Sequence, residues 1–310
     1  MNKQINKNSI KKNIDNKKFY QYDNKIHSED CIVGLSKVCP NSADIIIADP
    51  PYNIKKNFGI NKDNLSLDEY KKWCKKWVDE CIRILKPNGV CYIYGFSEIL
   101  AHISTLIPVD KQRWLIWHYT NKTIPQLNFW QRSHESIICL WKNKPIFNVD
   151  DVRVPYTEAF LKNSAGKKRT STKCRFNNDS NYESYYTPHK KGALPKDVFN
   201  ISSLAGGKGV QERYFYCKTC NKFCEPKERH VHDNCDIVIH PTQKPYELTK
   251  KLIIASMPKQ DICNILIPFC GSGIECYVSK KLGANYISFE INEDYINLAE
   301  NFVKNAKIGK

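Results

Sequence analysis

Short apolar runs alternate with amphipathic stretches in two blocks of this chain, at residues 25–141 and 241–303. The short runs are rich in Ile and Val and fit buried strands, whereas the longer stretches repeat apolar residues every three or four positions, as helices do. Such an alternation is typical of a parallel sheet covered by helices. The first block predicts a strand, an acidic turn and a helix start over 25–36, then a strand over 44–48, a helix over 67–85, a strand over 90–94 and a helix over 96–107.

Two strands, at 113–119 and 136–141, follow with no helix between them. Their connection, residues 121–134, is polar and aromatic. The second block predicts a helix over 246–256, a strand over 262–268, a helix over 274–282, a strand over 286–289 and a last amphipathic helix to about residue 303.

Residues 1–18 and 145–240 lack this alternation. Residues 1–18 are almost entirely Lys, Asn, Gln, Ser and Ile, so they bury too little apolar surface to offset chain entropy and are predicted to form a disordered basic tail. That tail could attract phosphates, or simply reflect an AT-rich genome. Residues 145–240 contain many Lys, Arg, Ser, Asn and Tyr residues and few apolar runs, which predicts an insertion between the two patterned blocks.

Charge raises the expectation of a polyanionic partner. The 310 residues contain 48 Lys and Arg against 32 Asp and Glu, a net charge of +16, and the sequence pI is about 9.1. A basic surface of this size suits nucleic acid but does not identify it. No apolar run approaches the roughly 20 residues that span a bilayer. The 14 cysteines are scattered through predicted strands and helices, so we expect reduced thiols in an intracellular protein, cytoplasmic or nucleoid-associated.

The turn at Asp49, Pro50, Pro51 and Tyr52 carries the first candidate chemistry. The two prolines stop the strand at 44–48, since neither can donate a ladder hydrogen bond, and they present an acid and an aromatic ring at the strand's carboxyl end. Ligands bind at that edge in open α/β sheets. The turn resembles the catalytic Asp-Pro-Pro-Tyr signature of S-adenosylmethionine-dependent DNA amino-methyltransferases, which methylate the exocyclic amine of adenine or cytosine.

This resemblance implies a role for each residue of the turn. The Asp49 carboxylate and the Pro50 carbonyl would accept the two N–H groups of the amine and make its nitrogen more nucleophilic. Tyr52 would stack on a base that has been flipped out of the duplex. A strand end followed by an incidental Pro-Pro turn is the alternative interpretation.

A second motif group supports the resemblance. Phe269, Cys270, Gly271, Ser272 and Gly273 follow a predicted strand and open a helix, where glycines let the backbone approach a ligand. By resemblance they form the methionine-binding loop, and Glu290 at the end of the next strand would bind the ribose hydroxyls. Thr242 and Lys244, within 240–245, are the expected contacts of an extra cofactor-binding segment.

Two features qualify the cofactor assignment. Asp30 is expected at the end of a strand beside the strand that leads to Asp49, where the family has an acid that binds the cofactor's adenine amine; as an alternative it caps the following helix. Ile267 stands where the family commonly has an Asp before the Pro-Phe of the loop. A carboxylate that helps hold the methionine ammonium is therefore missing from that position.

Recognition residues are expected in two places. In the family the last two strands form an antiparallel hairpin whose connection faces the flipped base, so Asn128, Phe129 and Trp130 are candidate base-pocket residues. Residues 145–240 correspond to the target-recognition region, in which basic residues such as Lys167, Lys168 and Arg169 lie near Tyr182, Tyr185 and Tyr186. A long surface insertion without this role remains the alternative.

A group of cysteines and histidines inside that region predicts a structural zinc site. Cys217 with Cys220 and His232 with Cys235 form two pairs at the same short spacing, as tetrahedral zinc sites have. Cys224 and His230 are alternative ligands, and unligated surface cysteines are the other interpretation.

Together these features predict a doubly wound α/β, Rossmann-like methyltransferase sheet, mostly parallel with one antiparallel hairpin. Its circularly permuted motif order matches the β class. Residues 19–144 and 241–310 would form the catalytic domain around the inserted region. We expect site-specific adenine-N6 methylation of double-stranded DNA within a restriction-modification system, with a cognate endonuclease and a homodimer left open. The alternatives are cytosine-N4 methylation, methylation of RNA or of a glutamine amide, and a zinc-containing nucleic-acid-binding protein with an inactive core.

Overall fold

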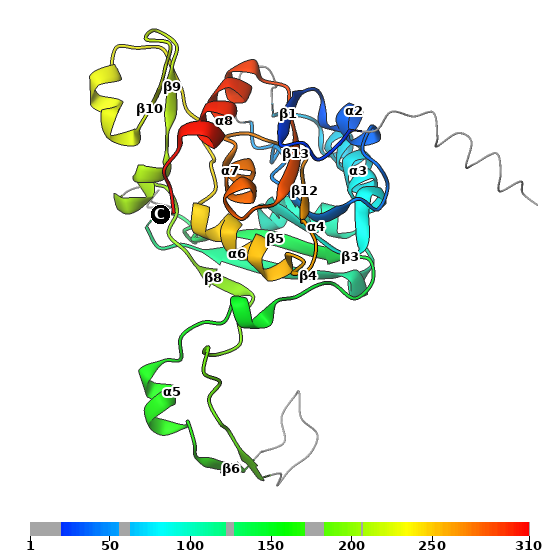
Figure 1. The fold of residues 1–310 in the computed structure, drawn as a ribbon, viewed down its shortest axis with the longest axis vertical. Coiled ribbons are helices and arrows are strands. Elements are labelled where there is room, and N and C mark those ends of the chain that lie inside the picture. Colours follow the sequence, from blue (N-terminus) through cyan, green and yellow to red (C-terminus); the bar gives the residue numbers. More distant parts are fainter. Residues whose placement is uncertain (1–19, 56–62, 122–126, 171–182, 206, 310) are drawn as a thin grey trace, which may run out of the picture.

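A central sheet of eight strands organises the chain (Figure 1). The computed structural model describes residues 20–55, 63–121, 127–170, 183–205 and 207–309. β5 is antiparallel to both of its neighbours, and the other adjacent strands are parallel. The fold is therefore a mostly parallel α/β sheet with one antiparallel hairpin, as predicted. In sheet order the strands are β1 (Lys25–Ser28), β13 (Asn285–Glu290), β12 (Asn264–Ile267), β2 (Ala43–Ala48), β3 (Leu85–Gly95), β5 (His134–Trp141), β4 (Gln112–His118) and β8 (Val198–Asn200).

Helices cover both faces of this sheet, and the centre of β2 is accordingly apolar on both faces. All six residues of β2 are buried: Ile45 and Ile47 pack into the cluster of α6 (Tyr246–Ser256), α7 (Ile274–Lys281) and α8 (Glu293–Asn305). Ile46 and Ala48 pack with α2 (Cys31–Ser36), α3 (Leu67–Ile84) and α4 (Ser97–Ser104). A continuous apolar run is what a doubly covered parallel strand requires.

The amphipathic helix predicted over 67–85 is α3. The Ser66 hydroxyl accepts from the Glu69 amide and the Glu69 carboxylate accepts from the Ser66 amide, which completes a capping box. Trp77 and Cys81, four positions apart, are fully buried. The tryptophan is a core residue, as its spacing predicted.

The permuted order brings the two patterned blocks together at the centre of the sheet. β12 from the second block pairs in parallel with β2 from the first, with Ile265 opposite Ile45 and Leu266 opposite Ile46. From this pair the chain proceeds through α7 to β13 on one side and through α3 to β3 on the other. The carboxyl ends of β2 and β12 thus lie side by side at the switch point, where α/β sheets bind ligands.

One sequence expectation needs correction. Asp30 follows β1, and we expected that strand beside β2, but β13 and β12 lie between them. β1 and β2 follow each other in the sequence but are not neighbours in the sheet, because β1 pairs with the strand that ends at Glu290. Part of the insertion joins the sheet, since β8 at 198–200 pairs with β4 at its edge.

The rest of the insertion forms two projections (Figure 1). An arm that contains α5 (Glu158–Asn163), β6 (Lys168–Thr170) and β7 (Glu183–Tyr185) extends away from the sheet. A small module of β9 (Phe215–Cys217), β10 (Lys222–Cys224), the 3-10 helix Pro226–His232 and β11 (Ile237–Val238) packs beside α8. Further 3-10 turns are Val109–Lys111, Val149–Asp151 and Gly207–Glu212.

Several sequence expectations concern residues at or beyond the limits of this description. The predicted tail at 1–18 and Tyr182 lie outside the described residues.

Thirteen of the 14 cysteines are described, and all thirteen are free thiols. No helix in the described ranges is both long enough and apolar enough to cross a bilayer.

Candidate active site

The carboxyl ends of β2 and β12 open onto one cavity of about 260 Å³. Its wall combines segments that lie far apart in the chain, so the turn at 49–52 and the loop at 269–272 face the same space. Except for Gly273, every residue expected to act in catalysis or cofactor binding lines this cavity. The lining segments include residues 29–31, 49–54, 242–244, 268–272 and 289–292.

Asp49 is the first residue after β2, and both of its carboxylate oxygens have partners. The Tyr52 hydroxyl donates to Oδ1 at 2.8 Å, and Lys244 Nζ lies 2.9 Å from Oδ2. The Lys244 side chain is 2% exposed, and its Nζ lies 5.3 Å from the ring centroid of Tyr52 and 5.2 Å from that of Tyr94. We expected Lys244 as a cofactor contact; it lines the cavity, and its ammonium contacts the carboxylate of the turn.

Glu135, at the start of β5, completes this group. Its Oε2 accepts from the Tyr52 hydroxyl at 3.2 Å and lies 3.5 Å from Lys244 Nζ. Burial raises the pKa of Asp49, and the charge of Lys244 opposes that rise. Burial by itself would lower the pKa of Lys244, but the charges of Asp49 and Glu135 raise it. Lys244 therefore stays protonated beside a carboxylate whose proton affinity is increased.

Hydrogen bonds from two neighbouring segments fix the Pro-Pro turn. The Tyr70 hydroxyl of α3 donates to the Pro51 carbonyl at 2.7 Å. Asn53 has a left-handed backbone (φ 57°), which Asn tolerates better than most residues. Its amide donates to the Asp63 carboxylate at 2.6 Å. The position of the turn is thus set before any ligand binds.

The loop after β12 is held by Glu290. One carboxylate oxygen accepts from the Gly271 amide at 2.9 Å, and the other accepts from the amides of Ile291 and Asn292 at 3.0 Å. Burial raises the pKa of Glu290, while these three bonds oppose the rise. Gly271 has φ 51°, and a Cβ there would lie 2.9 Å from His240 Nε2. A side chain at 271 would therefore clash as well as strain the backbone.

Two of the remaining predicted residues have structural roles. The Asp30 carboxylate accepts from the Ile32 amide at 2.9 Å and caps α2, as the alternative interpretation proposed, and it also lines the cavity. Gly273 caps α7 with φ 81°, and a Cβ there would lie 2.7 Å from Ala299 Cβ. It shapes the loop from behind the cavity wall.

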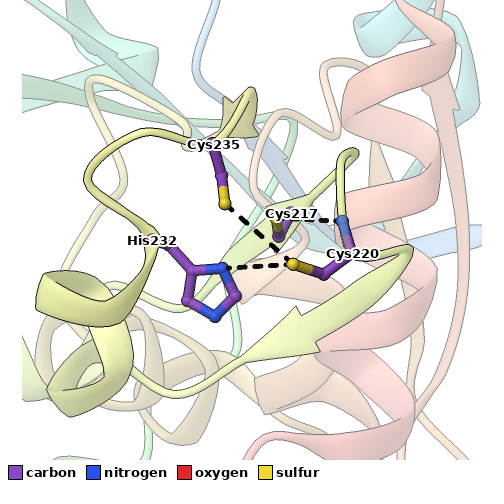
Figure 2. Close-up of side chains that lie close together, drawn as sticks. All are labelled: Cys217, Cys220, His232 and Cys235. Carbon is purple, nitrogen blue, oxygen red and sulfur yellow. Dashed lines mark hydrogen bonds between the residues drawn. The ribbon is translucent and has the colours of Figure 1, made fainter.

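The four expected zinc ligands lie together in the module beside α8 (Figure 2). Their ligand atoms all lie within 4.8 Å of one another. Cys220 Sγ is 4.0 Å from Cys235 Sγ and 3.8 Å from His232 Nδ1. Thiolates about 2.3 Å from a tetrahedral ion lie about 3.8 Å apart, so this spacing suits zinc.

The alternative ligands lie outside that group. Cys224 Sγ lies 3.4 Å from Nε2 of His232, the ring nitrogen that faces away from the cluster. His230 is exposed, and its Nδ1 lies 2.9 Å from the Lys227 carbonyl oxygen. The geometry therefore selects Cys217, Cys220, His232 and Cys235 from the six candidates.

Comparison with known proteins decides the family. Residues 43–301 match the N6/N4 methyltransferase family, described as DNA methylase. The chain belongs to this family of DNA methyltransferases. It is 30% identical over 287 residues to the type II methyltransferase M1.MboII of Moraxella bovis, across 91% of this chain and 96% of that one. It is 28% identical over 275 residues to the DNA adenine methyltransferase YhdJ of Escherichia coli (strain K12), across 87% and 79%.

A solved structure agrees on the fold of this methyltransferase. PvuII DNA methyltransferase, named as cytosine-N4-specific, superimposes with a TM-score of 0.58 over 92% of this chain and 87% of that one. The two sequences are 13% identical, so this likeness concerns the fold alone. The relatives thus include enzymes named for adenine and for cytosine.

Three expected base-pocket residues do not reach the cavity of the methyltransferase. Phe129 is 77% exposed and Trp130 is 87% exposed, and Asn128 is also exposed. They lie on the β4–β5 connection at the same edge of the sheet but are absent from the cavity wall.

Three other residues of the site were missed by sequence reasoning. Glu135 contacts Tyr52 and Lys244 but does not line the cavity, and it had no signal beyond its position just before the strand predicted at 136–141. Trp73 was assigned to the core by its helical spacing. Trp73 in fact lines the cavity and packs on Phe269, with ring centroids 5.7 Å apart. Glu275 had no signal beyond its position two residues after the loop.

Proposed function

We propose that this methyltransferase transfers a methyl group from S-adenosylmethionine to the N6 amine of adenine in double-stranded DNA. The proposal rests on the shared cavity, in which the turn at 49–52 faces the loop at 269–272. The leading Asp of the turn favours adenine, because a leading Ser is the more usual signature for cytosine N4. The adenine specificity in the name of YhdJ also supports this assignment.

The polar groups of the cavity suit S-adenosylmethionine. In this proposal Glu290 would bind the ribose hydroxyls, Asp30 would bind the adenine amine, and the backbone near Gly271 would bind the methionine part. A Cβ at Gly271 would obstruct that approach. Bound there, the cofactor supplies a methyl group activated by its sulfonium charge.

The residues of the turn act on the base. Asp49 and the Pro50 carbonyl accept the N–H groups of the flipped adenine, and Tyr52 stacks on its ring. The amine nitrogen forms the new bond to the methyl carbon as the carbon–sulfur bond breaks, and the electron pair goes to sulfur. The nitrogen then loses a proton, which Asp49 would accept. No covalent enzyme intermediate is needed, and positioning supplies most of the rate.

The test is transfer of labelled methyl from S-adenosylmethionine to unmethylated DNA of mixed sequence, followed by nucleoside digestion and chromatography. We expect the label in N6-methyladenine. Label in N4-methylcytosine would overturn the base assignment and keep the mechanism. No label in DNA, with cofactor binding measured separately, would point to RNA or protein substrates; loss of cofactor binding as well would indicate an inactive core.

Residues 145–240 are proposed as the target-recognition region, with the arm and the module as separate parts. The arm carries exposed Lys162, Lys167 and Lys190, which suit phosphate contacts. Near its base, Tyr156 stacks on Phe160 with ring centroids 4.8 Å apart. The type II name of M1.MboII further supports a cognate restriction endonuclease.

Zinc in the module is proposed as a structural cofactor. Cys217, Cys220, His232 and Cys235 would fill all four tetrahedral positions, so the ion should not be catalytic. The module also packs on the catalytic domain: Lys218 Nζ lies 2.6 Å from Asp294 of α8, and Tyr214 packs on Phe302 with ring centroids 5.5 Å apart. The ion would thus stabilise the segment that leads into 240–245.

We predict about one zinc ion per chain in protein purified without chelator, measured by elemental analysis. Cys235→Ser should lower the zinc content several-fold, because a hydroxyl is a poor zinc ligand. Cys39→Ser, at an exposed thiol outside the module, is the matched control and should retain full zinc. Zinc near zero in the wild-type protein would rule the site out.

A further inference from the structure

Glu275 is a buried acid with an unused oxygen in the wall of the active-site cavity. It lies in the first turn of α7, two residues after the loop, and is 4% exposed. Among the described residues, its Oε1 has no hydrogen-bond partner. A buried polar atom without a partner costs about 1–3 kcal/mol, so its presence calls for an explanation.

In the described part of the chain, no Lys, Arg or His forms an ion pair with this carboxyl. The charge of Lys244 lowers the pKa of Glu275, but the Lys244 ammonium contacts Asp49 and Glu135. Burial raises the pKa of Glu275 to about 8, and the charge of Asp49 adds to the rise. A buried carboxyl without an ion-pair partner is suited to bind a cationic group of a ligand in the cavity.

The loop itself lacks such an acid. Ile267, where the family commonly has an Asp, ends β12 and is fully buried. Ile267 does not line the cavity, whereas Pro268, Ile274 and Glu275 do. Glu275 thus supplies a carboxylate to the cavity wall eight residues after the position of Ile267.

We infer that Glu275 binds the α-ammonium of the methionine part of S-adenosylmethionine and replaces the carboxylate that is absent at Ile267. The inference rests on the proposed cofactor. It predicts that the amino-acid end of the ligand, and not the nucleoside end, depends on Glu275. A purely structural buried acid would affect both ends equally.

Calorimetric binding of two ligands separates these cases. S-adenosylhomocysteine carries the ammonium, whereas 5′-methylthioadenosine has the same nucleoside and a thioether but no amino-acid end. Glu275→Gln should weaken S-adenosylhomocysteine binding about tenfold or more, the usual size for a lost hydrogen bond between charged groups, and leave 5′-methylthioadenosine unchanged. Glu247→Gln is the matched control, since Glu247 is an exposed acid in the first turn of α6, and should change neither affinity.

A second variant tests the replacement itself. Adding Ile267→Asp to Glu275→Gln should restore part of the S-adenosylhomocysteine affinity, with folding checked by thermal unfolding. Equal losses for both ligands, or no loss for either, would overturn the inference while the proposed function stands. A wild-type protein that binds neither S-adenosylmethionine nor S-adenosylhomocysteine would overturn the proposed cofactor, and this inference with it.

Discussion

Asp49→Ala is expected to reduce methyl transfer by about 10³-fold or more while S-adenosylmethionine binds within a few-fold of its wild-type affinity. Loss of one preorganised partner of a reacting group typically costs about 10²–10³ in rate. Here the same change also removes the proton acceptor and releases the Tyr52 hydroxyl and the Lys244 ammonium. Single-turnover transfer to unmethylated DNA, with cofactor affinity from calorimetry, measures both quantities.

Asp44→Ala provides a matched control on the same strand. Asp44 is 5% exposed and lies 2.8 Å from Lys86 Nζ, so it too is a buried, ion-paired carboxylate, but it lies at the opposite end of β2. The control should lose stability and keep its transfer rate per folded molecule. If Asp49→Ala retained activity above a tenth of wild type, the catalytic assignment would be wrong.

The fold was predictable because its local signals agree with one another. The apolar run of β2, the spacing of α3 and the turn residues of the loop each fix an element without reference to distant contacts. The permuted order came from the family resemblance, since the turn at 49–52 precedes the loop at 269–273 in the chain.

Pairing between distant segments was less predictable. Asp30 was expected beside the Asp49 strand, yet β1 pairs with β13, because parallel neighbours are chosen by packing across the whole sheet. β8 has three residues, too few for a periodic signal, and it forms only by adding to the edge of β4.

The residues of the candidate site also differ in how well the sequence predicts them. Asp49 and Gly271 belong to short motifs at strand ends, so residue type and spacing were enough to select them as candidates. Glu135 accepts a hydrogen bond from Tyr52, 83 positions away in the sequence, and no local pattern predicts that contact. Glu275 likewise becomes conspicuous only when its burial and the position of Ile267 are seen together.

Lys244 makes two contacts that the sequence did not predict. Its ammonium lies between two largely buried carboxylates, at 2.9 Å from Asp49 and 3.5 Å from Glu135. Lys244→Met should therefore destabilise the protein by about 3–5 kcal/mol, the usual cost of breaking a buried ion pair by removing one partner. Denaturant unfolding would measure this loss. Lys86→Met breaks the ion pair with Asp44, which lies away from the cavity. Its effect on transfer shows how much activity is lost through reduced stability alone.

The pH dependence of methyl transfer shows whether Lys244 positions and tunes Asp49 or only stabilises the fold. Asp49 must be ionised to accept an amine N–H group, so activity falls as the pH drops through its pKa. Lys244 lowers that pKa against the effect of burial, and its removal should move the acidic fall in activity to higher pH. At neutral pH the variant should lose at least tenfold in single-turnover rate and recover part of it in alkaline buffer, whereas Lys86→Met keeps the wild-type profile. An unshifted profile in Lys244→Met would limit this lysine to a structural role.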